Sequence, residues 1–279
     1  MLMRCAVLGS PIAHSLSPVL HRAAYDALGV TGWRYDAYDV GQAGLRPFIE
    51  SLDHTWRGLS LTMPLKRAIL PLLDDVRETA RIAGVANTVL IDSAGRRTGE
   101  NTDTPGMVNA LRAAGVDRVE SAVVAGAGAT AASVVLALHR LGVHEILLLA
   151  RAPAKAAGVQ ELASRLGVRL RVLELTAGHA SADLLVSTLP ADASPAGLAG
   201  VAPVVFDVVY RPWPTPLVEA AAQRGALTLG GLDLLVHQAA LQVEEMLEVR
   251  VAPLEQMMVA GRLALADQAT SRTAEASGD

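Results

Sequence analysis

Short hydrophobic runs alternate with longer alanine-rich stretches along most of the chain. The hydrophobic runs span residues 5–8, 121–125, 146–150, 184–187 and 204–208. Polar residues do not alternate with apolar ones inside these runs, which is typical of strands that are buried on both faces. The stretches between the runs are compatible with helices. The alternation therefore predicts parallel strands joined by helical crossovers, and an α/β fold.

The same pattern divides the chain near residue 104. A predicted helix at 105–115 precedes a second glycine-rich strand and turn at 121–131, and a helical pattern at 232–247 could carry the chain back to the first part. A chain of 279 residues is long enough for two packed domains. We expect a first domain at 1–104 that is completed by 234–269, a second domain at 105–233, and a disordered tail at 270–279.

Composition and charge favour a small-molecule partner. The formal net charge is -4 and the chain has no run of Lys or Arg, so we expect no nucleic acid and no membrane surface as partner. Cys5 is the single cysteine, and the seven histidines do not cluster at metal-ligand spacing. These features predict neither a disulfide nor a metal site. Since no apolar segment resembles a leader or a membrane span, we expect a cytoplasmic protein.

A dinucleotide-binding signal follows the hydrophobic run at 121–125. The run leads into Gly126-Ala-Gly128-Ala-Thr-Ala131 and then into a helical stretch, which is the G-x-G-x-x-A form of the fingerprint. Gly126 permits a tight turn, Gly128 lets backbone N–H groups approach a pyrophosphate, and Ala131 allows close helix packing. Such a motif can arise by chance in a chain rich in alanine and glycine, but its flanks favour the functional interpretation. The predicted cofactor-binding residues here are Gly126, Ala127, Gly128, Ala129, Thr130 and Ala131.

The end of the next predicted strand indicates which nucleotide is bound. An acidic residue at this position would bind the ribose 2'-hydroxyl of NAD, whereas a basic one accommodates the 2'-phosphate of NADP. The chain has Arg151 and Lys155 here and no Asp or Glu. Two cations can bind a phosphate dianion, so the sequence favours NADP, although both residues could also be ordinary solvated side chains.

A serine-rich turn follows the first hydrophobic run. Ser17 is expected to cap the following helix, with Pro18 at its first position, and Ser15 lies two residues earlier. The two hydroxyls can serve the backbone alone, or they can bind a carboxylate at the start of the helix. From the residues alone, both interpretations stay open.

Three further segments resemble turns or strand ends when each is taken alone. They are Thr62-Met-Pro64-Leu-Lys66, Asn87-Thr88 and Asn101-Thr102-Asp103. Together with the Ser-x-Ser-Pro turn and the fingerprint, in this order, they resemble the shikimate dehydrogenase family. The resemblance continues through Asp207, Tyr210 and Thr215 to Gln238, and thus covers nearly the whole chain.

The resemblance implies a fold and an activity. It implies an N-terminal α/β substrate domain and a Rossmann-like, doubly wound NADP-binding domain, with a cleft between them. It also implies reversible NADPH-dependent reduction of 3-dehydroshikimate to shikimate, in the pathway to chorismate and the aromatic amino acids. We expect a monomer or a homodimer.

The resemblance also assigns roles to residues. Lys66 and Asp103 would act on the C3 hydroxyl or carbonyl, and which group delivers the proton stays open. Thr188 and Gly231 would lie beside the cofactor. The implied substrate-binding residues are Ser15, Ser17, Thr62, Asn87, Thr102, Tyr210 and Gln238.

Some positions depart from the family pattern, and two other functions remain in view. Ser60 stands where many members carry Asn, and Ala150 and Ala152 flank Arg151 where many members carry polar residues. One alternative is a quinate or aminoshikimate dehydrogenase, against whose NAD-linked form Arg151 and Lys155 argue. The other is a catalytically silent NADP-binding sensor, against which the joint presence of Lys66 and Asp103 argues.

Overall fold

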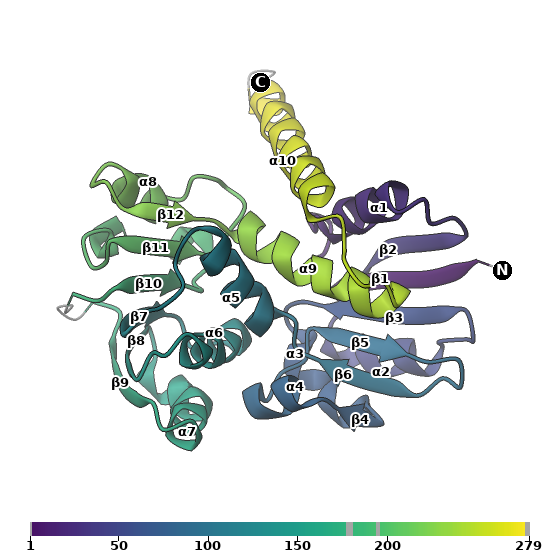
Figure 1. Ribbon diagram of the computed structural model, residues 1–279, viewed down its shortest axis with the longest axis horizontal. Helices are drawn as coiled ribbons and strands as arrows, with labels where there is room; N and C mark the ends of the chain where they lie inside the picture. The colour runs from purple at the N-terminus through teal and green to yellow at the C-terminus, as the bar shows by residue number, and fades with distance from the viewer. Residues whose placement is uncertain (1, 177–180, 194–195, 277–279) are drawn as a thin grey trace. The chain divides into compact units, whose positions relative to one another are not determined.

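A computed structural model describes residues 2–176, 181–193 and 196–276 of the chain (Figure 1). The chain forms two compact units, and each is described by itself. Unit 1 consists of Met1–Ala80, Ala86–Thr102 and Leu235–Asp279, and unit 2 consists of Arg81–Val85 and Asp103–Leu234. The purple beginning of the chain and the yellow helix near its end in Figure 1 therefore belong to the same unit.

The strands of unit 1 form a mixed sheet in the order β2-β1-β3-β5-β6-β4. Their bounds are β1 Met3–Gly9, β2 Trp33–Asp39, β3 Trp56–Leu61, β4 Asp75–Val76, β5 Thr88–Ile91 and β6 Arg97–Glu100. Strand β5 pairs antiparallel with β3 and with β6, whereas the other pairs are parallel. The sequence pattern predicts parallel strands throughout, and these two pairs differ from it.

The short connection between β5 and β6 explains why this pair is antiparallel. Parallel neighbours need a crossover of about a dozen residues or more, and only residues 92–96 lie between these strands. The Asp92 carboxylate accepts hydrogen bonds from the backbone N–H groups of Ala94 and Arg96, both at 2.9 Å. Gly95 adopts a φ of 81° there, which suits glycine in a tight turn. The result is a hairpin.

Helices cover both faces of the unit 1 sheet. Their bounds are α1 Ser17–Ala27, α2 Gln42–Glu50, α3 Leu65–Ala68, α9 Gly231–Leu247, which begins in unit 2, and α10 Leu254–Ala276; a 3-10 turn, η1, spans Leu70–Leu72. Along β1, Ala6 and Leu8 pack with residues of α2, whereas Cys5 and Val7 pack with Tyr25 of α1 and with Met246 of α9. Burial on both faces explains why the run at 5–8 is continuously apolar.

Helix α10 packs against α1 and continues to Ala276. The sequence predicts disorder from residue 270, and the structure differs from that expectation over residues 270–276. Alanine, arginine and glutamate, which favour helices, make up much of this stretch and allow the helix to continue. Residues 277–279 of the predicted tail lie outside the described residues.

Unit 2 is a doubly wound parallel sheet with the strand order β12-β11-β10-β7-β8-β9. Its strands are β7 Ser121–Ala125, β8 Glu145–Ala150, β9 Arg169–Glu174, β10 Leu184–Ser187, β11 Val204–Asp207 and β12 Leu227–Leu229. Numbered from the first strand of the unit, this is the 3-2-1-4-5-6 order of the Rossmann fold. All of its pairs are parallel. The predicted Rossmann-like domain is confirmed.

Two cores lie on opposite faces of this sheet. The helices are α5 Asp103–Ala113, α6 Ala129–Arg140, α7 Ala157–Arg165 and α8 Pro216–Ala222, with 3-10 turns η2 Pro153–Ala156, η3 Ala191–Ala193 and η4 Ala196–Leu198; α4, Glu78–Ala83, crosses the boundary between the units. Along β7, Ala122 and Val124 pack with α5, α6 and α7, whereas Val123 and Ala125 pack with α8 and η4. The sheet holds the end of β7 between these two layers.

The packing of α9 on the unit 1 sheet gives a test of the fold. A Cβ atom at Gly58 of β3 would lie 2.6 Å from Cγ of Met246. We expect Gly58→Ala to lower the free energy of unfolding by about 1–3 kcal/mol through overpacking. Met246→Ala opens the space, so the double variant should lose clearly less than the sum of the two single losses. Urea unfolding followed by circular dichroism measures this, and additive losses would contradict the packing.

Candidate active site

The predicted substrate residues of unit 1 lie near the ends of β1 and β3, where the strand order of the sheet reverses. Strand β1 pairs with β2 on one side and with β3 on the other, and ligands of open α/β sheets bind outside the carboxyl ends of the strands at such a point. Gly9 ends β1 and Thr62 directly follows β3. The Thr62 N–H donates to Leu8 O at 2.9 Å, and a Cβ atom on Gly9 would overlap the Thr62 methyl group. Only glycine permits this approach.

The antiparallel strands bring two more predicted residues to the same edge. Because β5 runs opposite to β3, it begins where β3 ends, and the Leu61 N–H donates to Asn87 O at 2.7 Å. The Asn87 N–H donates to Glu100 O, the last residue of β6, at 3.1 Å. Asn87 and Thr102 therefore lie together, although 15 positions separate them in the chain.

The serine turn differs from its prediction by one position. Helix α1 begins at Ser17 itself, and its N-cap residue is Leu16. The prediction that Ser17 caps the helix is therefore wrong. The Ser15 hydroxyl accepts a hydrogen bond from the Ser17 N–H at 3.3 Å, so Ser15 serves the backbone donor instead. Ser17 is buried, whereas Ser15 is half-buried.

Lys66 and Asp103 each lie near the start of a helix. Lys66 is the second residue of α3, is half-buried, and its backbone carbonyl accepts from the Ala86 N–H at 2.8 Å. Asp103 directly follows Thr102, begins α5 and is 6% exposed. A carboxylate in the first turn of a helix interacts favourably with the helix dipole. Lys66 belongs to unit 1 and Asp103 to unit 2.

Asn87, Thr102 and Gln238 form one buried hydrogen-bonded group. The Asn87 Oδ1 accepts from the Thr102 N–H at 2.7 Å. The Asn87 Nδ2 donates to the Thr102 hydroxyl at 2.9 Å and to Gln238 Oε1 at 3.1 Å. All three residues are at most 6% exposed. The structure thus brings together three of the predicted substrate residues from a strand start, a strand end and α9.

Sequence reasoning missed a second glutamine behind this group. Gln242 is 1% exposed, and its Nε2 donates to the Thr88 hydroxyl at 2.9 Å. Its Oε1 accepts from the Ser60 hydroxyl at 2.7 Å, and Ser60 accepts from the Tyr35 hydroxyl at 2.6 Å. Gln238 and Gln242 are four positions apart in a mostly apolar helix, so they share one face. That spacing is the signal that could have found Gln242.

A buried histidine completes this group. His21 has no exposed surface, and its ring stacks on Tyr35 with centroids 3.8 Å apart. Its Nε2 lies 3.3 Å from Gln242 Oε1. Because that oxygen can only accept, the imidazole Nε2 carries the hydrogen. Burial lowers the pKa of His21 to about 3, so the ring is neutral near pH 7.

The fingerprint of unit 2 lies at the corresponding point of its own sheet. Gly126 follows β7, adopts a φ of 107°, and a Cβ atom there would overlap the Thr188 hydroxyl after β10. The Thr188 N–H and hydroxyl both donate to Ala125 O, at 2.7 and 3.0 Å. This contact makes glycine necessary at position 126 and places Thr188 beside the turn.

The start of helix α6 is open toward a ligand. Gly128 is its N-cap residue and offers no side-chain cap, and a Cβ atom at this position would have no described heavy atom within 4 Å. Ala129 and Thr130 begin the helix half-buried, while Ala131 is fully buried as close packing requires. Uncapped N–H groups at a helix start form an anion site, and Ala127 lies in the turn before them. These residues fit a dinucleotide pyrophosphate.

Arg151 and Lys155 follow the neighbouring strand. Arg151 comes directly after β8 and Lys155 lies in η2, and both are exposed. The Gly126 N–H donates to Leu149 O at 2.8 Å, which ties the fingerprint turn to the end of β8. Within the described part of the chain, no hydrogen bond or ion pair engages either cationic side chain. They fit the 2'-phosphate of NADP.

Tyr210 and Gly231 lie after the last two strands of unit 2. The Gly231 N–H donates to Val209 O at 3.0 Å, and a Cβ atom at Gly231 would overlap the carbonyl oxygen of Val208. Tyr210 is half-buried, and burial raises the pKa of its phenol. The segment between the end of β11 and the start of α8 is held by the Thr215 hydroxyl, which donates to the buried Asp207 carboxylate at 2.8 Å. Tyr210 belongs to unit 2, unlike the other predicted substrate residues.

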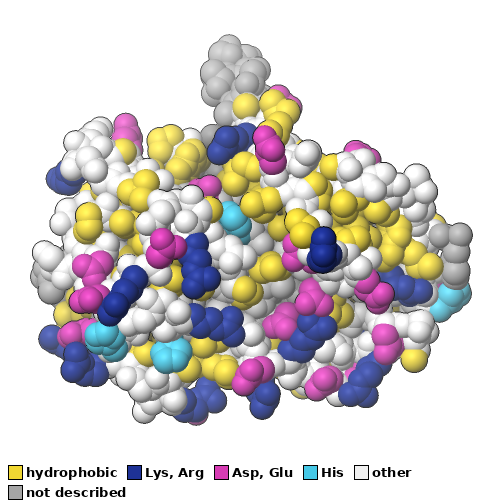
Figure 2. Space-filling model, in the orientation of Figure 1, with side chains coloured by type: hydrophobic (Ala, Val, Ile, Leu, Met, Phe, Trp, Pro, Cys, Tyr) yellow, Lys and Arg dark blue, Asp and Glu magenta, His cyan; other side chains and the backbone are white. Residues whose placement is uncertain are grey.

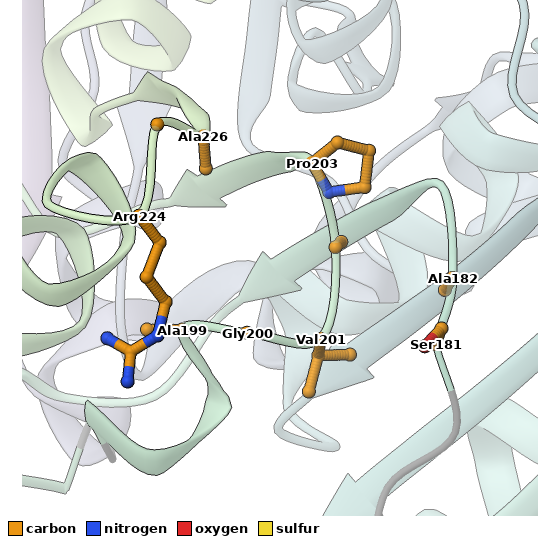
Figure 3. A pocket seen from close by; sticks show the side chains of 10 residues that line it. Ser181, Ala182, Ala199, Gly200, Val201, Pro203, Arg224 and Ala226 are labelled. Atoms are coloured by element: carbon orange, nitrogen blue, oxygen red, sulfur yellow. The ribbon is translucent and has the colours of Figure 1, made fainter.

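Other hollows of the described residues lie away from the predicted site residues, and one in unit 1, of about 470 Å³, is lined by Asp53, Asp92 and Arg97 among others. A hollow of about 390 Å³ lies at the amino ends of β10, β11 and β12, opposite the fingerprint edge, and Arg224 is its one charged lining residue (Figure 3). On the face in Figure 2, Lys and Arg are interspersed with Asp and Glu. Among the described residues, no group of three His, Cys, Asp or Glu side chains could hold a metal, and none of the helices could cross a membrane.

Comparison with known proteins finds relatives over nearly the whole chain. Residues 7–89 match the family model for the shikimate dehydrogenase substrate binding domain. The shikimate dehydrogenase (NADP(+)) of Desulfitobacterium hafniense is 36% identical over 276 residues, which cover 95% of this chain and 100% of the relative.

Solved structures agree with this comparison. The crystal structure of Mycobacterium tuberculosis shikimate dehydrogenase has a TM-score of 0.85 at 40% identity, and the match covers 94% of this chain and 99% of that one. The shikimate 5-dehydrogenase of Thermus thermophilus, in complex with NADP(H) and shikimate, has a TM-score of 0.84 at 35% identity, with 95% and 100% covered.

The buried histidine predicts a specific dependence of stability on pH. Its pKa of about 3 in the folded protein lies below the value of about 6.5 in an unfolded chain. The unfolded chain therefore binds a proton that the folded protein does not, so stability falls as the pH drops from about 6.5 toward 3. His21→Phe keeps an aromatic ring on Tyr35 and should make this fall shallower. Urea unfolding between about pH 7 and pH 4 measures it, and equal slopes would contradict the burial of a neutral imidazole.

Proposed function

The chain belongs to the shikimate dehydrogenase family, and we propose on this premise that it catalyses the reversible NADPH-dependent reduction of 3-dehydroshikimate to shikimate. The observation that carries the proposal is the buried group of Asn87, Thr102 and Gln238, which lies at the edge of the unit 1 sheet where Thr62 and Lys66 follow β3. The reaction belongs to the pathway that leads to chorismate and the aromatic amino acids.

The nucleotide residues of unit 2 support NADP as cofactor. Gly126 and Gly128 leave the first turn of α6 accessible to the pyrophosphate, and Arg151 and Lys155 supply cations for the 2'-phosphate. When bound, NADPH supplies the hydride that reduces the ketone. Thr188 and Gly231 would bind near its nicotinamide half, because both lie after strands at the carboxyl edge of the sheet.

The substrate residues of unit 1 suit a hydroxylated ring with a carboxylate. Ser15 and Ser17 lie at the start of α1, where a helix favours an anion. The Asn87 and Gln238 amides and the Thr62 hydroxyl can each donate or accept hydrogen bonds, as ring hydroxyls require. We assign the carboxylate to the serine turn and Tyr210, and the hydroxyls to the amides, Thr62 and Thr102.

Lys66 and Asp103 would perform the proton chemistry. Reduction of a ketone places negative charge on its oxygen, and a positioned ammonium group stabilises that charge and delivers a proton to it. Lys66 fits this role. The Asp103 carboxylate would bind the neighbouring hydroxyl of the substrate, since a carboxylate accepts hydrogen bonds only.

We also propose that the enzyme works in the cytoplasm as a monomer or a homodimer. The support for the compartment is the single cysteine, Cys5, which is buried as a free thiol. Free thiols persist where glutathione and thioredoxin keep proteins reduced. Size-exclusion chromatography with light scattering would distinguish the two assembly states.

An initial-rate assay tests the proposed reaction. Purified protein is supplied with shikimate or quinate, each with NADP or NAD, and nucleotide reduction is followed by absorbance at the nicotinamide band. We expect turnover chiefly with shikimate and NADP. Lys66→Ala should lower kcat by about 100-fold or more, because general acid–base catalysis typically contributes that much, while NADP binding stays nearly unchanged.

The other outcomes of this assay are equally informative. A preference for quinate or NAD would move the activity to a quinate dehydrogenase. Binding of NADPH without turnover of any pair would favour a nucleotide-binding sensor. Asp103→Ala serves as the second variant, and full activity of either variant would contradict its assigned role.

Arg151 gives a separate prediction for cofactor choice. Arg151→Ala removes a charged hydrogen-bond donor from the 2'-phosphate, and we expect the KM for NADP to rise by about 10-fold to 100-fold. The KM for NAD should change little, because NAD lacks that phosphate. Arg171→Ala is the matched control, since Arg171 is an exposed arginine of β9 in the same unit. An equal loss with both nucleotides would contradict the assignment.

A further inference from the structure

The buried polar residues of unit 1 form a hydrogen-bond series, in which every group donates to the next. The Tyr35 hydroxyl donates to Ser60, and Ser60 donates to Gln242 Oε1. The other end of the Gln242 amide donates to the Thr88 hydroxyl at 2.9 Å, and Thr88 donates to Asn87 Oδ1 at 3.0 Å. The Asn87 Nδ2 then donates to Gln238 Oε1 at 3.1 Å. The hydrogen-bond series thus runs from the interior of the unit to two predicted substrate residues.

Backbone groups determine the direction of donation along this hydrogen-bond series at its three side-chain amides. The Thr102 N–H can only donate, so it identifies the Asn87 atom that it contacts as the oxygen. The backbone carbonyl oxygen of Asn87 can only accept, so the Gln242 side-chain atom 3.3 Å from it is the nitrogen. The Gln238 Nε2 likewise donates to Leu235 O at 2.9 Å. If any of the three side-chain amides rotated so that its oxygen and nitrogen changed places, a donor would face a donor or an acceptor would face an acceptor.

Gln242 uses both ends of its amide fully. Its oxygen accepts from Ser60 at 2.7 Å and lies 3.3 Å from His21 Nε2, while its nitrogen donates to Thr88 and to Asn87 O. An amide oxygen has two acceptor sites and an amide nitrogen has two hydrogens. The side chain therefore has one orientation that satisfies all of its neighbours.

We propose that Gln242 is a positioning residue of the active site: through Thr88, and together with the Thr102 N–H, it holds the Asn87 amide in the orientation in which Asn87 and its partner Gln238 meet the substrate. The inference rests on the proposed function, because it takes Asn87 and Gln238 as substrate residues. Gln242 itself is 1% exposed and acts through its neighbours. A hydroxyl has a single hydrogen, and the Gln242 nitrogen leaves that of Thr88 available for Asn87, whereas an acceptor in its place would compete for it.

Gln242→Glu tests this with almost no change in shape. The ionised carboxylate that this substitution introduces only accepts, so it would take the Thr88 hydrogen away from Asn87. We expect the KM for shikimate to rise about tenfold at alkaline pH, which corresponds to one hydrogen bond of about 1.4 kcal/mol. The KM for NADP should stay unchanged. A variant that was merely unstable would instead lower kcat at unchanged KM.

The dependence of this effect on pH separates positioning from packing. Burial raises the pKa of a carboxyl group, and a protonated carboxyl can donate to Thr88 as the amide does. The loss should therefore shrink toward acidic pH in Gln242→Glu. Of the titratable groups in the described residues around this amide, burial in the unaltered protein keeps His21 neutral, by lowering its pKa to about 3, and Tyr35 protonated, by raising its pKa. Gln256→Glu, at an exposed position of α10, is the matched control without effect.

Thr88 provides a second pair of variants in case Gln242→Glu does not fold. Thr88→Val keeps the shape and removes the hydroxyl, so the KM for shikimate should rise by a similar factor. Thr88→Ser keeps the hydroxyl and should restore the KM to near the original value. An unchanged KM in both Thr88→Val and Gln242→Glu would overturn the inference.

The outcomes distinguish this inference from the proposed function. If the unaltered protein neither binds nor turns over shikimate, both are overturned. If it turns over shikimate with NADP and the variants keep its KM at every pH, the proposed function stands and the positioning role of Gln242 is overturned. A raised KM that recovers in Thr88→Ser supports both.

Discussion

The hydrogen bonds of Asn87 hold three elements of unit 1 together, and the site depends on them. Its backbone carbonyl accepts from the last residue of β3, and its backbone N–H donates to the last residue of β6. Its side chain accepts from the Thr102 N–H and donates to Gln238 of α9. The residue is 2% exposed, and leaving a buried partner unpaired costs about 1–3 kcal/mol. Strand ends and helix are thereby held at fixed distances, which a hydrogen-bonding site requires.

Both units use the same local arrangement at the end of their first strand, which is the point where the strand order of each sheet reverses. In unit 1, Gly9 ends the first strand and faces Thr62, whose N–H donates to the residue before the glycine. In unit 2, Gly126 faces Thr188 in the same way, and the Thr188 N–H donates to Ala125 O. A β-carbon on either glycine would overlap the threonine. Two strands that lie side by side can therefore end in turns that stay close together, and each turn presents backbone groups at the carboxyl edge.

Much of this architecture could be predicted from local sequence. The buried strands are continuous apolar runs, and the fingerprint at Gly126 is a contiguous motif that encodes its own turn. The antiparallel β5 could not be predicted from periodicity alone, because its short run resembles the others and its direction is set by the hairpin at Asp92. The predicted cap of α1 is wrong by one residue because the helix begins at Ser17 itself after Leu16, and only the folded turn shows that the Ser15 hydroxyl accepts from the Ser17 N–H.

The buried hydrogen-bond series behind the proposed substrate residues was harder to predict. Its members come from β2, β3, β5 and α9, and only the folded structure brings them together. The resemblance to the family implies Asn at position 60, where this protein has Ser60. In this protein the Ser60 hydroxyl accepts from Tyr35 and donates to Gln242, so the smaller residue is part of the hydrogen-bond series.

The ligands proposed for the two units call for different physical means of recognition, and this explains which residues each unit offers. Phosphates carry full charge, so open N–H groups at α6 and the exposed Arg151 and Lys155 suit them without strict direction. Ring hydroxyls carry no charge and must be told apart by where they donate and accept. Oriented amides do this, because a ligand that lacks the matching hydroxyl leaves buried polar groups unpaired, which can discriminate far more strongly than a hydrophobic pocket. The orientation of Asn87 and Gln238 then matters as much as their presence, which gives a physical reason to retain a fully buried glutamine in an otherwise apolar helix.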